Sequence, residues 1–96
     1  MMNNALIVGR IVKIKNKQRT IVTVAVPRAF KNSVGEYETD MIPVILYGSI
    51  SKTTLEYCGK GDMIGVKGKL QVESGILRLV ADKVTFLSTK REKVNE

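Results

Sequence analysis

Histidine and tryptophan are absent from the sequence, and cysteine occurs once, as Cys58. Without histidine, the chain has no imidazole to act as a general acid or base and no Cys/His pair to act as a nucleophile. A lone cysteine also leaves too few ligands for a zinc cluster and cannot form a disulfide within the chain. We therefore expect no catalytic residues, no metal site and no cofactor, and we interpret Cys58 as a small buried side chain.

Long apolar runs are missing as well. The apolar run near the start, residues 5–8, is far shorter than the core of a signal peptide or the ~18 residues of a membrane helix. We therefore expect a cytoplasmic protein that does not bind membranes. With 96 residues, the chain has room for one small core but not for a second domain, so a partner subunit would add stability.

Acidic residues are scarce in the first third of the chain. The first one is Glu36, and the basic residues that precede it are Arg10, Lys13, Lys15, Lys17, Arg19, Arg28 and Lys31. The whole chain has 16 Lys and Arg against 9 Asp and Glu, which gives a formal net charge of +7. A field of one sign attracts polyanions, and it binds nucleic acid by releasing condensed counterions. The alternative is a basic face that serves only solubility.

Five segments are predicted to be strands, because they either alternate apolar with other residues or are rich in Val, Ile and Thr. They are residues 5–15, 20–26, 39–47, 63–72 and 76–87. Residues 16–19 and the Ser74-Gly75 pair predict tight hairpin turns. Residues 31–38 are polar and predict a longer, flexible, projecting loop.

One stretch between the third and fourth predicted strands is suited to a helix, residues 49–61. Either Ser49 or Ser51 can cap its start, and Gly59 and Gly61 can end it. The predicted order of elements is therefore β-β-β-α-β-β.

Period-two alternation separates the two faces of the predicted strands. The residues that we expect to face the core include Val22, Val24, Val26, Ile42, Val44, Leu46, Ile64, Val66, Leu70 and Val72. The residues on the opposite faces include Ile21, Thr23, Ala25, Met41, Pro43, Ile45, Tyr47, Lys67 and Lys69. One outer surface is therefore predicted to combine apolar groups with lysines.

Such a combination suits single-stranded nucleic acid, which exposes both phosphates and unstacked bases. Proteins that bind it without sequence preference use a cationic groove and aromatic side chains on which bases stack. Phe30 and Tyr47 are the candidate stacking platforms. The alternative is that Phe30 is an ordinary hydrophobic residue at the base of a loop and Tyr47 a half-buried strand residue.

Four stretches of the sequence resemble the bacterial single-stranded DNA-binding proteins. They are NNALIVGRI (3–11), TDMIPVILYG (39–48), LEYCGKGDMIGVKGKL (55–70) and VADKVTFLS (80–88). The resemblance implies an all-β fold, a five-stranded OB-fold Greek-key barrel with one helix between the third and fourth strands. We expect this domain over residues 1–88, followed by a short frayed C-terminal tail over residues 89–96.

The resemblance also implies sequence-tolerant binding and protection of single-stranded DNA. It places Phe30 and Tyr47 where the family has stacking aromatics, and Met41 where the family has Trp or Phe, so that a ring is missing there. Arg10 and Lys31 fall where the family carries basic side chains. The full set of residues that we expect to contact DNA is Arg10, Thr23, Arg28, Phe30, Lys31, Met41, Tyr47, Lys67 and Lys69.

A homo-oligomer, either a dimer or a tetramer, is a further implication, because the family pairs its first strands edge to edge. We assign Asn4, Leu6, Ile7 and Val8 to that interface. Family members continue into a long tail whose acidic, hydrophobic tip recruits replication and repair enzymes. This sequence ends without such a tip, so we do not expect recruitment by that route.

Three alternatives come from other classes of function. A primosomal-type OB-fold module that bridges replication proteins would explain the missing ring and the missing tip. An RNA-binding OB domain has less support, since the aromatic-rich motif of cold-shock proteins is absent. An enzyme would need Asp40, Asp62 or Asp82, which are scattered singly at strand ends and turns, and Asp62 next to Gly61 is typical of a turn.

Overall fold

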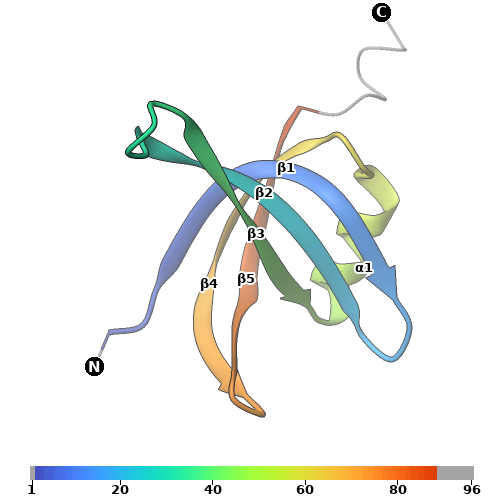
Figure 1. Cartoon of the computed structure of the whole chain (residues 1–96). Helices are drawn as coiled ribbons and strands as arrows, with labels where there is room; N and C mark the ends of the chain where they lie inside the picture. Colours follow the sequence, from blue (N-terminus) through green and yellow to red (C-terminus); the bar gives the residue numbers. More distant parts are fainter. Residues whose placement is uncertain (1, 89–96) are drawn as a thin grey trace, which may run out of the picture.

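The computed structural model describes residues 2–88, in which the chain forms five strands and one helix (Figure 1). The elements are β1 (Ala5–Asn16), β2 (Thr20–Lys31), β3 (Tyr37–Leu46), α1 (Gly48–Tyr57), β4 (Met63–Glu73) and β5 (Ile76–Ser88). Each lies where the sequence predicts it, with two differences in length: β2 continues to Lys31 instead of ending at Val26, and α1 ends at Tyr57 instead of reaching Gly61. The tail expected over residues 89–96 lies outside the described residues.

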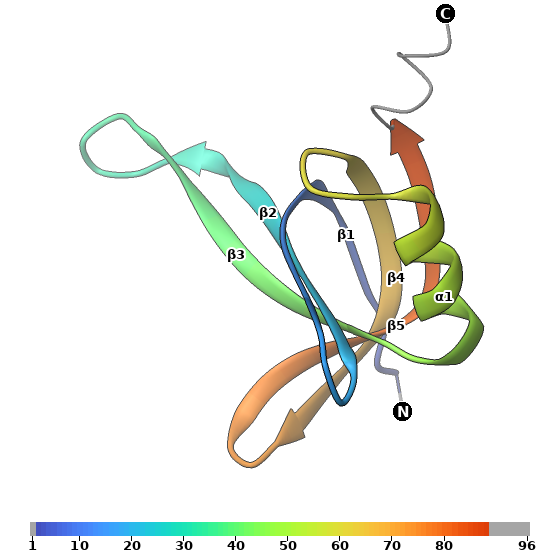
Figure 2. The same ribbon diagram turned by 90° about the vertical axis from the view of Figure 1, so that its right-hand side faces the viewer.

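The strands close into a barrel in the order β1, β2, β3, β5, β4. β3 and β5 run parallel, with Val44 opposite Leu79, and the other neighbouring pairs are antiparallel. This order and the position of α1 between β3 and β4 confirm the predicted five-stranded OB-fold barrel. α1 packs beside β5, on the side of the barrel opposite the projecting hairpin of β2 and β3 (Figure 2).

β1 is divided between two neighbours. Its first half pairs with β4, from Ala5 opposite Gly68 to Arg10 opposite Met63. Its second half pairs with β2, beginning at Arg10 opposite Ala25. Residues 5–9 therefore have a strand partner on one edge only among the described residues.

The inner faces of the strands form the core, as the alternation predicts. Its buried residues include Ile11, Val22, Val24, Val44, Leu46, Cys58, Ile64, Val66 and Leu79. Cys58 is thus a buried side chain, in agreement with its interpretation from the sequence. Branched aliphatic residues dominate this core because they suit the pleated, closely packed interior of a small barrel.

Three face predictions are wrong. Leu70 and Val72 were expected in the core but are exposed, because the hairpin of β4 and β5 extends beyond the closed part of the barrel (Figure 1). Ile45 was expected on an outer face and is fully buried. It lies between Ile21 of β2 and Val80 of β5, so it has apolar register partners on both sides.

The helix has the predicted position but not the predicted cap. Tyr47 is the residue that precedes its first turn, and no side chain caps it. Ser51 instead donates a hydrogen bond from its Oγ to Thr20 Oγ1 at 2.6 Å, which ties α1 to the start of β2. At the other end, Asp62 accepts the N–H of Gly59 at 2.8 Å, so Asp62 is the turn residue that the sequence predicts.

Two features hold the β4–β5 hairpin in place. Its turn has positive φ at both central residues, 51° at Ser74 and 78° at Gly75, as the tight two-residue hairpin predicts. Nearer the barrel, Gly68 packs against the backbone of β5, where an added Cβ would lie 2.1 Å from the carbonyl oxygen of Val80. The hairpin can form only because Gly68 lacks a side chain.

Candidate nucleic-acid interface

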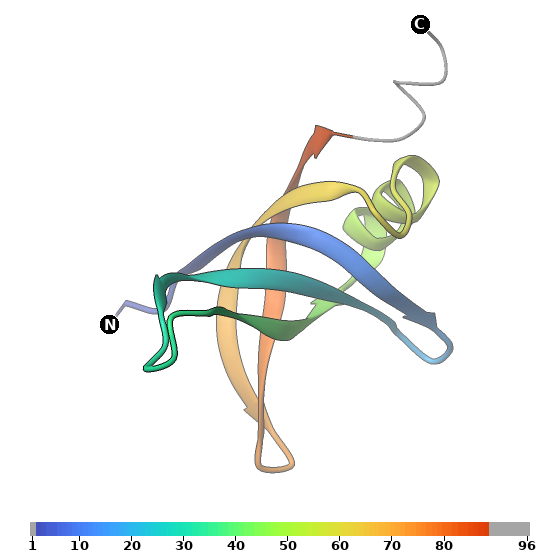
Figure 3. The same ribbon diagram turned by 45° about the horizontal axis from the view of Figure 1, so that its top comes forward.

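The outer surface of β1, β2 and β3, which we call the outer sheet face, brings basic and apolar residues into rows (Figure 3 shows these three strands crossing β4 and β5). Strand register defines three rows: Arg10, Ala25 and Met41; Lys13, Thr23 and Pro43; and Lys15, Ile21 and Ile45. Each row has a cation on β1 and an apolar residue on β3, which is exposed at Met41, half-buried at Pro43 and buried at Ile45. A border of positive charge therefore runs parallel to an apolar border.

Lys13 and Lys15 belong to this face although the predicted contact set omitted them. Both are exposed, and they follow Arg10 along β1. A bulge between Ile11 and Lys13 changes the register, so that odd-numbered lysines continue the row begun by an even-numbered arginine. Alternation alone does not reveal this change of parity. Arg10 also donates a hydrogen bond from its Nη1 to the carbonyl oxygen of Gly61.

The three candidate base-contacting side chains are spread along the β2–β3 pair. Met41 and Tyr47 are 58% and 51% exposed, and they lie six residues apart along β3 and its end, roughly 20 Å at the rise of a strand. Phe30 is 84% exposed and lies near the far end of β2, on the projecting hairpin. The structure thus places the two aromatics at opposite ends of this strand pair, with Met41 between them.

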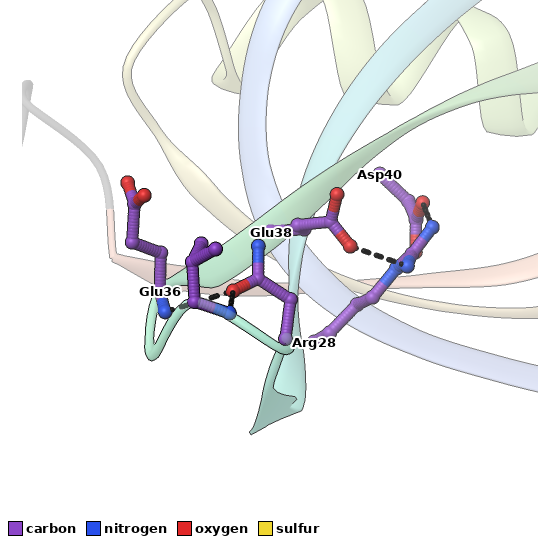
Figure 4. Close-up of polar contacts among 6 residues, drawn as sticks. Arg28, Glu36, Glu38 and Asp40 are labelled. Carbon is purple, nitrogen blue, oxygen red and sulfur yellow. Dashed lines mark hydrogen bonds and ion pairs between the residues drawn. The ribbon is translucent and has the colours of Figure 1, made fainter.

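Arg28 lies on the same hairpin between two carboxylates, an arrangement that we call the Arg28 cluster (Figure 4). Its Nε and Nη2 donate to Asp40 at 3.1 and 3.0 Å, and its Nη1 donates to Glu38 at 2.8 Å. These hydrogen bonds hold the pKa of Asp40 below its usual value. With one positive and two negative groups, the cluster carries a net charge of −1, so Arg28 has little attraction left for a phosphate.

The loop between β2 and β3 is closed by its own hydrogen bonds. Asn32 accepts the backbone N–H groups of Val34 and Glu36 on its Oδ1, both at 3.0 Å. Lys31 precedes this loop, with its Nζ 5.8 Å from the centre of the Tyr37 ring. This cation–π contact keeps the lysine at the base of the loop, near Phe30.

Lys67 and Lys69 are two residues apart on the outer side of β4 and both are exposed, but they have different neighbours in the sheet. Lys69 is opposite Val80, which neighbours Ile45, so it borders the outer sheet face. Lys67 is opposite Leu6 on one side and Lys83 on the other, among the residues around β1 and β5. Lys69 therefore borders the third row through Val80, whereas Lys67 borders the first half of β1, outside the three rows.

Two arginines and a glutamate meet between the β1–β2 turn and the β4–β5 hairpin, and we call them the Glu73 cluster. Arg19 donates both Nη atoms to the Glu73 carboxylate, with Nη1 2.9 Å from Oε2. Arg78 Nε lies 3.4 Å from Glu73 Oε1. The hydrogen bond with Arg19 lowers the pKa of Glu73, and the same contact raises the pKa of Arg19. No pattern in the sequence indicates this cluster, since 54 residues separate Arg19 from Glu73.

An apolar hollow of about 280 Å³ opens beside Met41, between β1, β3 and the β4–β5 hairpin. Its lining residues are Ala5, Ile7, Met41, Ile42, Pro43, Leu70, Leu77, Arg78 and Leu79. It exists because residues 5–9 of β1 have no partner on the edge that faces β2 and β3. Arg78 therefore joins this hollow to the Glu73 cluster.

The residues assigned to an oligomer interface divide into two groups. Leu6 and Val8 point outward and are exposed, as is Asn4 at the start of the chain. Ile7 was expected at the interface, but its side chain points into the barrel and packs against the core, because it alternates with Leu6 and Val8 along β1. Val8 and Leu87 lie on either side of Gly65, whose missing side chain leaves space between them.

Residues 2–88 contain neither a group of metal ligands nor a membrane-spanning helix. No group of three or more acidic, histidine or cysteine side chains is arranged to hold a metal ion in this part of the chain. The same residues contain no helix that is long and apolar enough to cross a membrane.

Comparison with known proteins extends the resemblance across the chain. Residues 2–87 match the Single-strand binding protein family. The chain is 36% identical to Single-stranded DNA-binding protein 1 of Clostridium acetobutylicum, with 97% of this chain and all of that protein covered. It is 34% identical to Single-stranded DNA-binding protein B of Bacillus subtilis, with 97% of each covered.

Solved structures agree on the fold. The mitochondrial single-stranded DNA-binding protein Rim1 from S. cerevisiae superposes with a TM-score of 0.74 at 20% identity, over 93% of this chain and 97% of the other. The Plasmodium falciparum SSB in complex with ssDNA gives a TM-score of 0.71 at 18% identity, over 92% and 96%. Together with the matching residues and the barrel order, these findings establish that the chain belongs to the single-strand binding protein family.

Proposed function

We propose that this protein binds single-stranded DNA without sequence preference along the outer sheet face. The observation that carries the proposal is that Arg10, Lys13 and Lys15 line one border of this face while the exposed Met41 and Tyr47 lie along the other. In the proposed complex the cations face phosphates and the apolar side chains contact bases. Single strands expose both kinds of group, whereas the bases of a duplex are already stacked on each other. The names of the relatives and the likeness to a complex with ssDNA support the same ligand.

Phe30 extends this surface along the projecting hairpin. Its ring is the most exposed of the aromatics, and Lys31 next to it supplies a positive charge. Thr23 lies in the row between Lys13 and Pro43, where it adds a polar contact. We leave Arg28 out of the proposed phosphate contacts because the Arg28 cluster is negative overall, and Lys67 because it lies beside Leu6 and Lys83, outside the three rows.

We also propose that the protein assembles as a dimer or tetramer through β1. Residues 5–9 present an unpaired strand edge, and Leu6 and Val8 present exposed apolar side chains beside it. An open edge with apolar neighbours invites pairing with another strand, and a second copy of the same chain satisfies it by symmetry. Light scattering at micromolar concentration should give a dimer or tetramer mass, and a concentration-independent monomer mass would contradict the assembly.

A fluorescence anisotropy titration tests the proposed ligand. Labelled dT, rU and duplex oligonucleotides of equal length are titrated with the protein at several salt concentrations. We expect binding to dT to exceed binding to duplex, and log K to fall with log salt by about 0.7 for each phosphate contacted. Equal affinity for single strand and duplex, or affinity that salt scarcely changes, would reject the outer sheet face as a base-contacting site.

A bridging module for other replication proteins is the second candidate, and the apolar hollow beside Met41 favours it. Met41→Trp separates the two candidates, because a ring at this position would add a stacking surface. If bases lie there, the variant should gain affinity for dT and not for duplex. No gain, combined with unchanged dT affinity in Phe30→Ala and Tyr47→Ala, would favour the bridging module.

A further inference from the structure

The Glu73 cluster lies between the two candidate base contacts of β3. Arg19 is next to Thr20, which is opposite Leu46 at the end of β3, and its side chain interacts with Tyr47. On the other side, Arg78 lines the apolar hollow together with Met41. A strand whose bases contact Tyr47 and Met41 would carry its backbone past these arginines.

The cluster has more donors than its single carboxylate can accept. Each guanidinium offers five N–H donors, ten in all, whereas one carboxylate offers about four acceptor positions. Arg78 Nε is buried and makes no hydrogen bond within the described residues, since Glu73 lies 3.4 Å away as an ion pair only. The net charge of the cluster is +1. Both the unused donors and the excess charge match a second anion.

We propose, on the basis of the proposed function, that Arg19 and Arg78 form a phosphate-binding site for the single strand and that Glu73 occupies this site as a built-in competitor. A backbone phosphate has the oxygen geometry of a carboxylate and can accept the same guanidinium fork. When the strand binds, its phosphate takes the place of the Glu73 carboxylate on Arg19. Glu73 thereby limits the affinity for single-stranded DNA.

The exposure of the three side chains fits this exchange. Arg78 and Arg19 are 19% and 29% exposed, whereas Glu73 is 48% exposed and lies at the end of β4. The arginines are therefore held in place by their surroundings, while the carboxylate can turn toward solvent. An ion pair that is open to water is weak, so a phosphate that many other contacts hold nearby can displace it.

Glu73→Gln tests the competitor directly. We expect the variant to bind a dT oligonucleotide about two- to five-fold more tightly than the unsubstituted protein at low salt, as loss of an exposed ion pair predicts. The slope of log K against log salt should become steeper by about 0.7, which corresponds to one further phosphate. Glu73→Ala should give the same gain, and thermal unfolding of both variants confirms that they are folded.

Two controls isolate the site. Glu56→Gln on α1 makes the same change in total charge at an exposed position away from the outer sheet face, and we expect less than half of the gain. In a background with both Arg19→Gln and Arg78→Gln, Glu73→Gln should give no gain, because both cations that contact Glu73 are gone. A gain that persists in this background would show a general charge effect and overturn the proposal.

The remaining outcomes are equally decisive. Weaker binding by folded Glu73→Gln would mean that Glu73 positions the arginines for DNA, which contradicts competition. Normal dT binding by the unsubstituted protein with no change in either Glu73 variant would overturn this inference and leave the proposed function intact. Absence of dT binding by the unsubstituted protein would overturn both.

Discussion

The Arg28 cluster and the Glu73 cluster are built from the same contact, an arginine fork on a carboxylate, yet they have opposite charge. Arg28 faces two carboxylates and the sum is −1, whereas Glu73 faces two arginines and the sum is +1. The contact itself therefore does not decide whether an arginine is available to DNA. The ratio of arginines to carboxylates decides it. Where arginines outnumber carboxylates, positive charge and N–H donors remain unused, and where carboxylates outnumber arginines, negative charge remains.

The two hairpins that carry these clusters also differ in charge and in aromatic side chains. The β2–β3 hairpin is long, negative at the Arg28 cluster and bears the exposed ring of Phe30 near its end. The β4–β5 hairpin has a two-residue turn, is positive at the Glu73 cluster and has no aromatic side chain within residues 69–79. We expect the first to act on DNA mainly by stacking and the second mainly by charge.

Gly68→Ala should produce the largest effect, because it disrupts the β4–β5 hairpin that carries the Glu73 cluster. Its Cβ would lie 2.1 Å from the backbone oxygen of Val80, so β4 and β5 would have to move apart. We expect a loss of about 3 kcal/mol in the free energy of unfolding, measured by urea titration. Gly35→Ala at the tip of the other hairpin has open space around it and a φ of 84°, so it should cost only about 1 kcal/mol.

If both glycine variants lose the same stability, the close approach of β4 and β5 at Gly68 is not a constraint. The β4–β5 hairpin would then be free to move, and the Glu73 cluster would have no fixed position.

Phe30→Ala should have the next largest effect, on binding and not on stability. Loss of one stacking platform should weaken dT binding by about 1–3 kcal/mol. Val34→Ala on the same hairpin removes another exposed apolar side chain and serves as the matched control. Equal losses in the two variants, or a lower stability of Phe30→Ala, would show that the ring supports the hairpin and does not contact bases.

Glu38→Gln sharpens the comparison of charges. The substitution brings the Arg28 cluster from −1 to neutral, but Asp40 still holds two nitrogens of Arg28. We therefore expect an increase in dT affinity of less than about two-fold, smaller than that of Glu73→Gln. A larger increase for Glu38→Gln would place the main phosphate site at the Arg28 cluster instead.

The smallest effect should appear in the pH dependence of stability. The pKa values of Asp40 and Glu73 are lowered in the folded protein by hydrogen bonds from Arg28 and Arg19. Stability from these pairs is therefore complete above the ordinary carboxyl pKa values, 3.8 and 4.5, and is lost as the pH falls through the lower folded values. Between pH 6 and pH 3, the midpoint temperature of thermal unfolding should fall less steeply in Asp40→Asn and Glu73→Gln than in the unsubstituted protein. Parallel curves for all three proteins would contradict both ion pairs.

The sequence by itself determined the elements and their order. Alternation of Val and Ile with polar residues placed all five strands, and the Ser74-Gly75 pair placed a hairpin turn, because these signals depend on neighbours within a few residues. Alternation also identified the exposed, outward positions of Met41 and Lys69. It failed for Leu70, since a strand that runs beyond the barrel keeps its apolar side chains without a core to cover them.

The tertiary structure alone decided which charges meet. Arg19 and Glu73 are 54 residues apart, and Arg28 reaches Asp40 because the antiparallel register of β2 and β3 places Val26 opposite Asp40. The bulge in β1 likewise brought Lys13 and Lys15 into line with Arg10. Closure of the barrel sets these distances, and electrostatic interactions depend on distance in space and not on separation along the chain.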